Sequence, residues 1–248
     1  ETNMLYVNTH DDQEEVASLI NKYGLIAIPV VDYEMCMVGI VTVDDAMAVL
    51  QEEATEDMSM MAGIAPSEDS YFGTSVWKHV RNRFPWLLFL MLSATMTGLL
   101  LGHYEGALAV MPILNTFVPM LTGTGGNCGS QSSTLIIRGL AVDEIEFGDI
   151  FKVLFKEIRI ALLAGFLLAI VNGIRIVLMY KDPMLAFAVG LTLMCTVILS
   201  KTIGCSLPLI AKKCGLDPAI MAAPLITTLV DTGTIFVYFT IVTRIFHI

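Results

Sequence analysis

Asp231 places a carboxylate near the middle of a long apolar segment, in the stretch PLITTLVDTGTIFVYF. The segment 218–246 is long enough to cross a bilayer, where an Asp at the centre of a helix costs roughly 2.5 to 3.5 kcal/mol on insertion scales. Pro224 interrupts the segment and frees carbonyls that can face water only inside a cavity. By helical spacing, further polar side chains share the face of Asp231: Thr227, Thr228, Thr234 and Tyr238. The pattern predicts a carboxylate that faces the interior of a helix bundle or an aqueous path, and the alternative is a structural Asp bonded to a neighbouring helix.

A second stretch, GTGGNCGSQ, combines small and polar residues within another apolar region. Gly125 and Gly129 form a GxxxG pair, which allows two helices to approach closely. The hydroxyl and amide groups beside them must face protein or water. Two interpretations stay open at this point: close helix packing, or the lining of a pore opposite the Asp231 face. A phosphate-binding loop is disfavoured, because no strand precedes the glycines and no Lys follows them.

Acidic residues crowd a predicted helix near the N-terminus. Like charges three or four residues apart repel one another on a helix, and bound cations would relieve that repulsion. The residues of this cluster are Asp45, Glu52, Glu53, Glu56 and Asp57. We interpret them as a divalent-cation site, and the alternative is a solvated acidic face.

Charge and composition divide the chain into an acidic head and an apolar body. The 248 residues are 55% hydrophobic with a net charge of −10; the first 70 residues hold fifteen acids and one base, and the rest hold nine acids and thirteen bases. Such a head repels nucleic acid and attracts cations. The five cysteines show no CxxC spacing, and the four histidines form no catalytic arrangement with Ser or Cys. The sequence therefore predicts neither an enzyme nor a zinc site.

The acidic head reads as a small α/β unit with the order helix, strand, strand, helix. Its segment GIVTVDD resembles the G-h-h-T-x-x-D element of cystathionine-β-synthase (CBS) domains, and the unit resembles the second half of a CBS pair. The resemblance implies that Thr42 and Asp45 bind the ribose of an adenine nucleotide, so ATP is a candidate ligand. The first 80 residues lack a signal-peptide pattern. We expect a missing N-terminal domain of the same chain upstream.

Five membrane spans are predicted after a basic interfacial segment. We place them near 84–101, 107–137, 158–179, 184–210 and 218–246. With the N-terminus in the cytosol, nine Lys or Arg residues fall inside and three outside, which satisfies the positive-inside rule and puts the C-terminus outside. The predicted domains are a partial CBS domain (1–50), an acidic connecting helix and linker (51–83), and a transmembrane domain (84–248). The fold is mostly α, in a multi-pass protein of the plasma or inner membrane.

Two long motifs, LTGTGGNCGSQSSTLIIRGLA and GLDPAIMAAPLITTLVD, together with the CBS half and the acidic helix, resemble the MgtE family of magnesium channels. The resemblance implies a homodimer whose pore lies between the second and fifth spans of both copies. Asp231 matches the family's pore-site aspartate, and Asp217 matches an ion position near the cytosolic side. The implied pore-lining residues are Gly125, Gly126, Asn127, Gln131, Pro224, Thr227, Thr228 and Thr234.

The resemblance also assigns the acidic helix as a plug that closes the pore when cytosolic Mg²⁺ is high. The implied sensor residues are Asp45, Glu53, Glu56, Asp57, Asp12 and Glu14. The leading hypothesis is a Mg²⁺ channel gated by Mg²⁺. One alternative is a proton-coupled carrier of divalent cations that titrates Asp231. Another is a nucleotide-sensing regulatory protein with a membrane anchor, for which five spans with polar faces are excessive. Lys201 is the other ionisable side chain deep in a span, and we expect it to snorkel.

Overall fold

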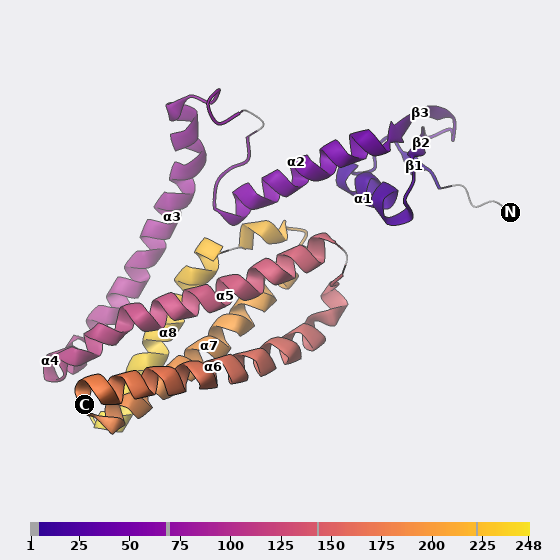
Figure 1. Ribbon diagram of the computed structural model, residues 1–248. Coiled ribbons are helices and arrows are strands. Elements are labelled where there is room, and N and C mark those ends of the chain that lie inside the picture. Colours follow the sequence, from indigo (N-terminus) through magenta and orange to yellow (C-terminus); the bar gives the residue numbers. More distant parts are fainter. Residues whose placement is uncertain (1–4, 68–69, 143, 222) are drawn as a thin grey trace. The chain divides into compact units, whose positions relative to one another are not determined.

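The computed structural model describes residues 5–67, 70–142, 144–221 and 223–248 (Figure 1). The chain forms two compact units. The first comprises Glu1–Ser59 with Pro66–Glu68, and the second comprises Met60–Ala65 with Asp69–Ile248.

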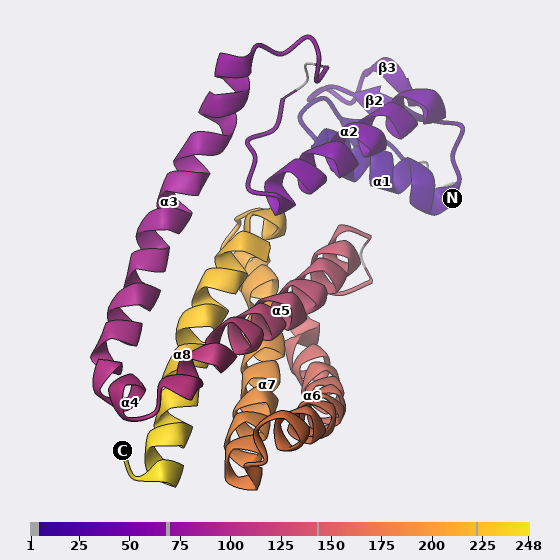
Figure 2. The ribbon, with the colours of Figure 1, turned by 60° about the vertical axis from the view of Figure 1, so that its left-hand side comes forward.

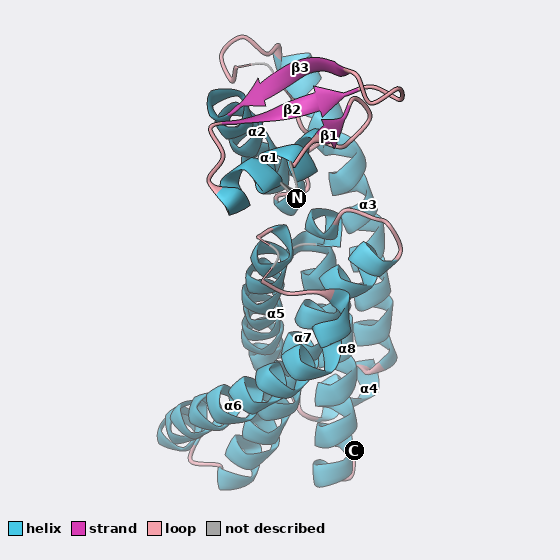
Figure 3. Ribbon diagram, turned by 90° about the vertical axis from the view of Figure 1, so that its right-hand side faces the viewer, coloured by secondary structure: helices cyan, strands magenta, loops and turns pink. Residues whose placement is uncertain are grey.

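The first unit is a three-stranded sheet with two helices on one face (Figure 3). Its elements are β1 (Val7–Asn8), α1 (Gln13–Tyr23), β2 (Ala27–Val31), β3 (Met37–Thr42) and α2 (Val43–Met61). The strand order is β1-β2-β3, with β1 parallel and β3 antiparallel to β2. The core between sheet and helices consists of small and aliphatic side chains: Val7, Val16, Ala17, Ile20, Ile28 and Ala46. The predicted helix–strand–strand–helix order is confirmed, and β1 is an addition too short to read from sequence.

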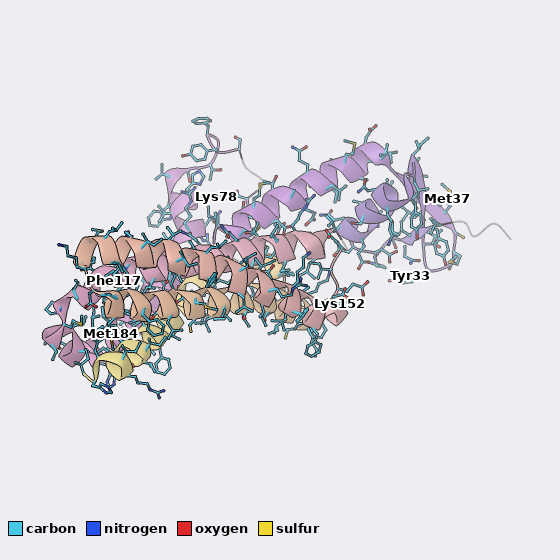
Figure 4. The ribbon with its side chains drawn as sticks, turned by 60° about the horizontal axis from the view of Figure 1, so that its bottom comes forward. Tyr33, Met37, Lys78, Phe117, Lys152 and Met184 are labelled. Atoms are coloured by element: carbon cyan, nitrogen blue, oxygen red, sulfur yellow. The ribbon has the colours of Figure 1, made fainter. Side chains whose placement is uncertain are left out.

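Local chemistry explains where the first unit's helices begin and end. The side chain of Asp12 caps α1 by accepting a hydrogen bond from the backbone N–H of Glu14 at 2.9 Å. Gly24 ends α1 in the left-handed region at φ 61°, where a residue without Cβ is favoured. Between β2 and β3, the side chain of Tyr33 in the turn and that of Met37 at the start of β3 are exposed (Figure 4).

The second unit is helical. Its elements are α3 (Val76–His103), α4 (Glu105–Val110), η1 (Pro112–Phe117), α5 (Val118–Ala141), η2 (Phe147–Asp149), α6 (Ile150–Tyr180), α7 (Pro183–Lys213), η3 (Pro218–Met221) and α8 (Ala223–Phe246). Helix α7 packs against α5, α6 and α8, and α3 packs against α8 (Figure 2). Four helical segments of the described chain are long and apolar enough to cross a membrane: Val76–His103, Phe147–Tyr180, Pro183–Lys213 and Pro218–Phe246.

The second predicted span differs from the structure. We expected one helix over 107–137, whereas α5 begins only at Val118, after α4 and η1. Pro112 explains the break, because it lacks an N–H and its ring disfavours a helical residue before it. Helix α5 is long enough to span at 24 residues. Its glycines and hydroxyl groups keep it out of the set of spans identified by apolar composition.

The largest core of the second unit joins η1, α5, α6, α7 and α8. The ring of Tyr104 stacks on Phe239 at 4.6 Å between centroids, and the hydroxyl of Tyr238 donates to the carbonyl of Leu114 at 2.9 Å. Tyr238 and Phe239 are fully buried. Because lipid chains are as apolar as these side chains, close packing and this hydrogen bond hold the helices together in a membrane.

Candidate functional site

Glycines bring α5 into backbone contact with its neighbours. A Cβ at Gly204 of α7 would overlap the carbonyl oxygen of Gly129, so the two backbones touch at this crossing. A Cβ at Gly125 would lie 2.8 Å from Val230 Cγ1, and one at Gly129 would lie 2.6 Å from Ile226 Cγ2. The earlier glycine, Gly125, meets the later residue, Val230, and the later glycine, Gly129, meets the earlier residue, Ile226. Helices α5 and α8 therefore run antiparallel. The packing interpretation of Gly125 and Gly129 agrees with these contacts.

Helix α5 has one closed and one open face. Gly125 and Gly129 are buried against α7 and α8, and Ser132 is buried on the same side of α5, whereas Asn127 and Gln131 are exposed. Within the described chain, neither Asn127 nor Gln131 makes a side-chain hydrogen bond. Two unpartnered amides four residues apart therefore line the open face of a helix embedded among membrane-spanning segments.

Asp231 lies on α8, one turn beyond Thr227. A Cβ added at Gly126 would lie 2.9 Å from Thr227 Cγ2, so this part of α8 packs closely on α5. The hydroxyls of Thr227 and Thr228 donate to the carbonyl of Pro224 at 2.9 and 3.0 Å. The carboxylate of Asp231 is partly exposed and has neither a hydrogen-bond partner nor an ion-pair partner among the described residues.

The polar stripe predicted around Asp231 divides into two groups. Thr234 and Tyr238 are fully buried inside the single chain, where Thr234 packs on Gly125 and Tyr238 bonds to η1. Thr227 and Thr228 are partly exposed on the same side as Asp231. Pro224 lies in the first turn of α8 and follows η3, so the span is divided beside it.

A buried ionic cluster that sequence reasoning missed joins α5, α6 and α7. Glu157 Oε2 accepts hydrogen bonds from Ser132 Oγ at 2.6 Å and from Lys201 Nζ at 3.2 Å. Lys201 Nζ also donates to Ser132 Oγ at 3.0 Å. Ser132 is fully buried, and the side chains of Glu157 and Lys201 are 8% and 9% exposed. The expectation that Lys201 snorkels to the interface is wrong, because Glu157 compensates its charge inside the protein.

Asp217 precedes the short helix η3. Its carboxylate accepts a hydrogen bond from the backbone N–H of Ala219 at 2.7 Å and so caps η3. Ala219 and Ile137 are buried together, and Met60 and Met61, at the end of α2, pack against them within the second unit. The predicted ion position at Asp217 thus lies at one end of the α5–α8 pair.

The acidic residues of the first unit have mainly local partners. Thr42 and Asp45 form a capping box at the start of α2: the Asp45 carboxylate accepts from the N–H and the hydroxyl of Thr42 at 3.1 and 2.6 Å. These hydrogen bonds, the hydroxyl first, lower the pKa of Asp45. Glu53 accepts from the amide of Gln13 at 3.1 Å.

The remaining predicted sensor residues lie on the same two helices: Glu14 on α1, and Glu56 and Asp57 on α2. In the described parts of the chain, no three His, Cys, Asp or Glu side chains come close enough to hold a metal ion together. The predicted metal positions therefore stay predictions about single residues.

Comparison with protein families decides the relationship of the chain. A family described as divalent cation transporter, MgtE, matches residues 118–241, and the CBS domain family matches residues 1–52. The first match covers half of the chain and contains α5, α7 and the Asp231 segment. The chain belongs to the MgtE family.

Similar proteins extend the MgtE match over nearly the whole chain. This chain is 36% identical over 246 residues to a protein of Bacillus subtilis (strain 168). It is 37% identical over 240 residues to a protein of Thermus thermophilus, and each relative is named "Magnesium transporter MgtE". These matches cover 99% and 96% of this chain, but 54% and 53% of the relatives. The chain therefore spans about half the length of the curated relatives it matches.

Membership in the MgtE family and the apolar helices together identify a multi-pass membrane protein that combines a partial CBS domain with a helical membrane domain. The relatives' names describe transporters and not enzymes, in agreement with the prediction from sequence.

One signal could have revealed the missed cluster. A Lys deep in a predicted span requires a counter-charge, and Glu157 stands one residue before the predicted third span. In the structure α6 begins at Ile150, so Glu157 lies two turns inside the helix rather than at its edge.

Proposed function

We propose that this chain is the membrane part, with one CBS half, of a magnesium-conducting channel in which Asp231 attracts the ion. The observation that carries the proposal is the partly exposed Asp231 carboxylate on a membrane-spanning helix, without a partner among the described residues. An unpaired intramembrane carboxylate is expensive unless it meets water or a cation. Mg²⁺ prefers oxygen ligands and keeps several of its waters, so a carboxylate can hold the hydrated ion by charge.

The pore forms between two copies of the chain. Asn127 and Gln131 on α5 and Thr227 and Thr228 on α8 would face lipid in a lone copy, at a high cost for unpartnered amides. A second copy placed over this face would enclose the polar groups around a water-filled path. It would also set two Asp231 side chains across one axis. Gly125 and Gly126 contribute by allowing α8 to lie close to α5 beside that path.

Gating by cytosolic Mg²⁺ is the regulatory part of the proposal. Acidic residues of α1 and α2 repel when cytosolic Mg²⁺ is low, and bound Mg²⁺ favours the closed state by linkage. The plug role proposed for α2 draws on its continuity with the membrane domain, because its last residues, Met60 and Met61, pack on Ile137 and Ala219 as part of the second unit. ATP is proposed as a second ligand at Thr42 and Asp45, where it would compete with their capping box.

The experiment is Mg²⁺ flux into liposomes that hold native chain, Asp231→Asn or Asp231→Ala. We expect native flux down the gradient and loss of discrimination against Ca²⁺ and Na⁺ in both variants. Asp182→Asn is the matched control, since Asp182 caps α7 and Asn is an equally good capping residue. Native flux and selectivity in both Asp231 variants would contradict the assignment of Asp231 to the pore. Saturable flux that requires a proton gradient would favour the proton-coupled carrier instead.

A further inference from the structure

The cluster of Ser132, Glu157 and Lys201 is a closed hydrogen-bonded triangle. Lys201 donates to both oxygen atoms, at 3.0 Å to Ser132 and 3.2 Å to Glu157, and Ser132 donates to the same Glu157 oxygen at 2.6 Å. Ser132 thus acts as donor and acceptor at once. The charges of the other two side chains cancel, which is the condition under which a buried ion pair is tolerated.

Each corner of the triangle comes from a different helix. Ser132 belongs to α5, Glu157 to α6 and Lys201 to α7. Glu157 and Lys201 alone would hold α6 to α7, which already pack along their lengths. The hydroxyl of Ser132 is the only corner that links α5 to the charged pair. Removing the Ser132 hydroxyl would leave the Glu157–Lys201 ion pair intact but would remove the hydrogen bonds between α5 and this pair.

This link determines how α5 can be rotated. The glycine contacts of α5 are steric, and they set how closely α5 approaches α7 and α8. A hydrogen bond to an ionised group is directional and stronger than a neutral one. Gln131 precedes Ser132, so the two side chains point about 100° apart around the helix. Holding Ser132 toward Glu157 and Lys201 therefore holds Gln131, and Asn127 one turn away, on the open face.

We propose that Ser132, Glu157 and Lys201 form a positioning cluster that fixes the rotation of α5 and thereby the ion selectivity of the pore face. The inference rests on the proposed transport function. None of the three side chains touches the ion; they act through the placement of Asn127 and Gln131. The cluster differs in kind from Asp231, because its charges are compensated within one copy of the chain.

Ser132→Ala tests the inference most directly, in liposomes that hold the 248-residue chain. We expect the ratio of Mg²⁺ to Ca²⁺ flux to change by about three- to tenfold, since a hydrogen bond to a charged group is lost. Ser200→Ala is the matched control: Ser200 is also a fully buried serine, next to Lys201, but it donates only to the carbonyl of Thr196 in its own helix. Thermal unfolding in detergent is measured on the same samples.

A second variant keeps the test decisive if Ser132→Ala folds poorly. Glu157→Met with Lys201→Met removes both charges and both hydrogen-bonding groups, so the protein should fold, but the selectivity ratio should still shift because Ser132 has lost its partners on α6 and α7. Native selectivity in Ser132→Ala, or in this double variant, overturns the positioning role. If the native chain passes Mg²⁺ and the variants keep its selectivity, the positioning role is wrong and the proposed function stands. If the native chain passes no Mg²⁺, the proposed function itself is wrong.

Discussion

Glu157 and Asp231 are both carboxylates on membrane-spanning helices, yet their surroundings are opposite. Glu157 is almost fully buried and accepts hydrogen bonds from Ser132 and Lys201. Asp231 is partly exposed and has no partner in the described chain. Their helices therefore place similar charges in an apolar region, but only one charge is neutralised by the fold.

The difference separates a structural charge from one available to a ligand. A buried ion pair costs desolvation on both sides and is repaid by its partner and by hydrogen bonds, so it serves position rather than binding. A carboxylate without such a partner needs water or a cation to be tolerated in the membrane. The comparison thus assigns Glu157 to the architecture of the membrane domain and supports the proposal that Asp231 attracts the transported ion.

Breaking the pair at Glu157 gives the largest expected effect. Lys201→Met leaves the Glu157 carboxyl group buried without its counter-charge, which should lower the free energy of unfolding by about 3 to 5 kcal/mol. Thermal unfolding in detergent measures the loss. Adding Glu157→Gln to the same chain should recover most of it. A single variant as stable as native protein would show that the pair does not compensate a buried charge.

The closed face of α5 can be tested separately from its open face. Gly204→Ala should destabilise by about 1 to 3 kcal/mol, because the new Cβ meets the rigid backbone carbonyl of Gly129. Gly123→Ala is the control on the exposed side of α5, where a Cβ meets nothing within 4 Å. That change should be neutral or stabilise by up to about 1 kcal/mol through helix propensity. Equal effects of the two substitutions, measured by unfolding, would contradict the assignment of faces.

Asp231 should contribute little to stability. Asp231→Asn removes a charge without breaking any hydrogen bond of the described chain, so the free energy of unfolding should change by no more than about 0.5 kcal/mol. Unfolding in detergent next to Lys201→Met makes the comparison quantitative. A loss as large as that of Lys201→Met would mean that Asp231 has a structural partner.

Substitution of Asp45, a carboxylate in the first unit, is expected to have the smallest effect on stability. Hydrogen bonds from Thr42 lower its pKa below the ordinary value of 3.8. Its contribution to stability is therefore present above pH 3.8 and is lost as the pH falls through the lowered pKa. Asp45→Asn should reduce the hydrogen-exchange protection of the first turn of α2 at neutral pH. The difference in protection between native protein and Asp45→Asn, measured at each pH, should become smaller in acid. A difference that grows in acid would contradict the capping box.

Much of the fold could be read from local patterns. Gly24, the Asp12 cap and the short apolar runs of β2 and β3 indicate the elements of the first unit, because each acts within a few residues. Four of the five expected spans follow from apolar length. The break before α5 was also readable, since Pro112 cannot continue a helix from Ala107, but the apolar composition of that stretch concealed it.

The sequence by itself determined which residues could do chemistry: an isolated Asp231, a glycine-rich helix and an acidic helix, each recognisable by type and spacing. Only the tertiary structure decided which of them are already satisfied. Glu157 and Lys201 lie 44 residues apart and meet because α6 and α7 pack side by side. Burial and compensation of a charge depend on what other helices bring to it, and local sequence carries little information about that contact.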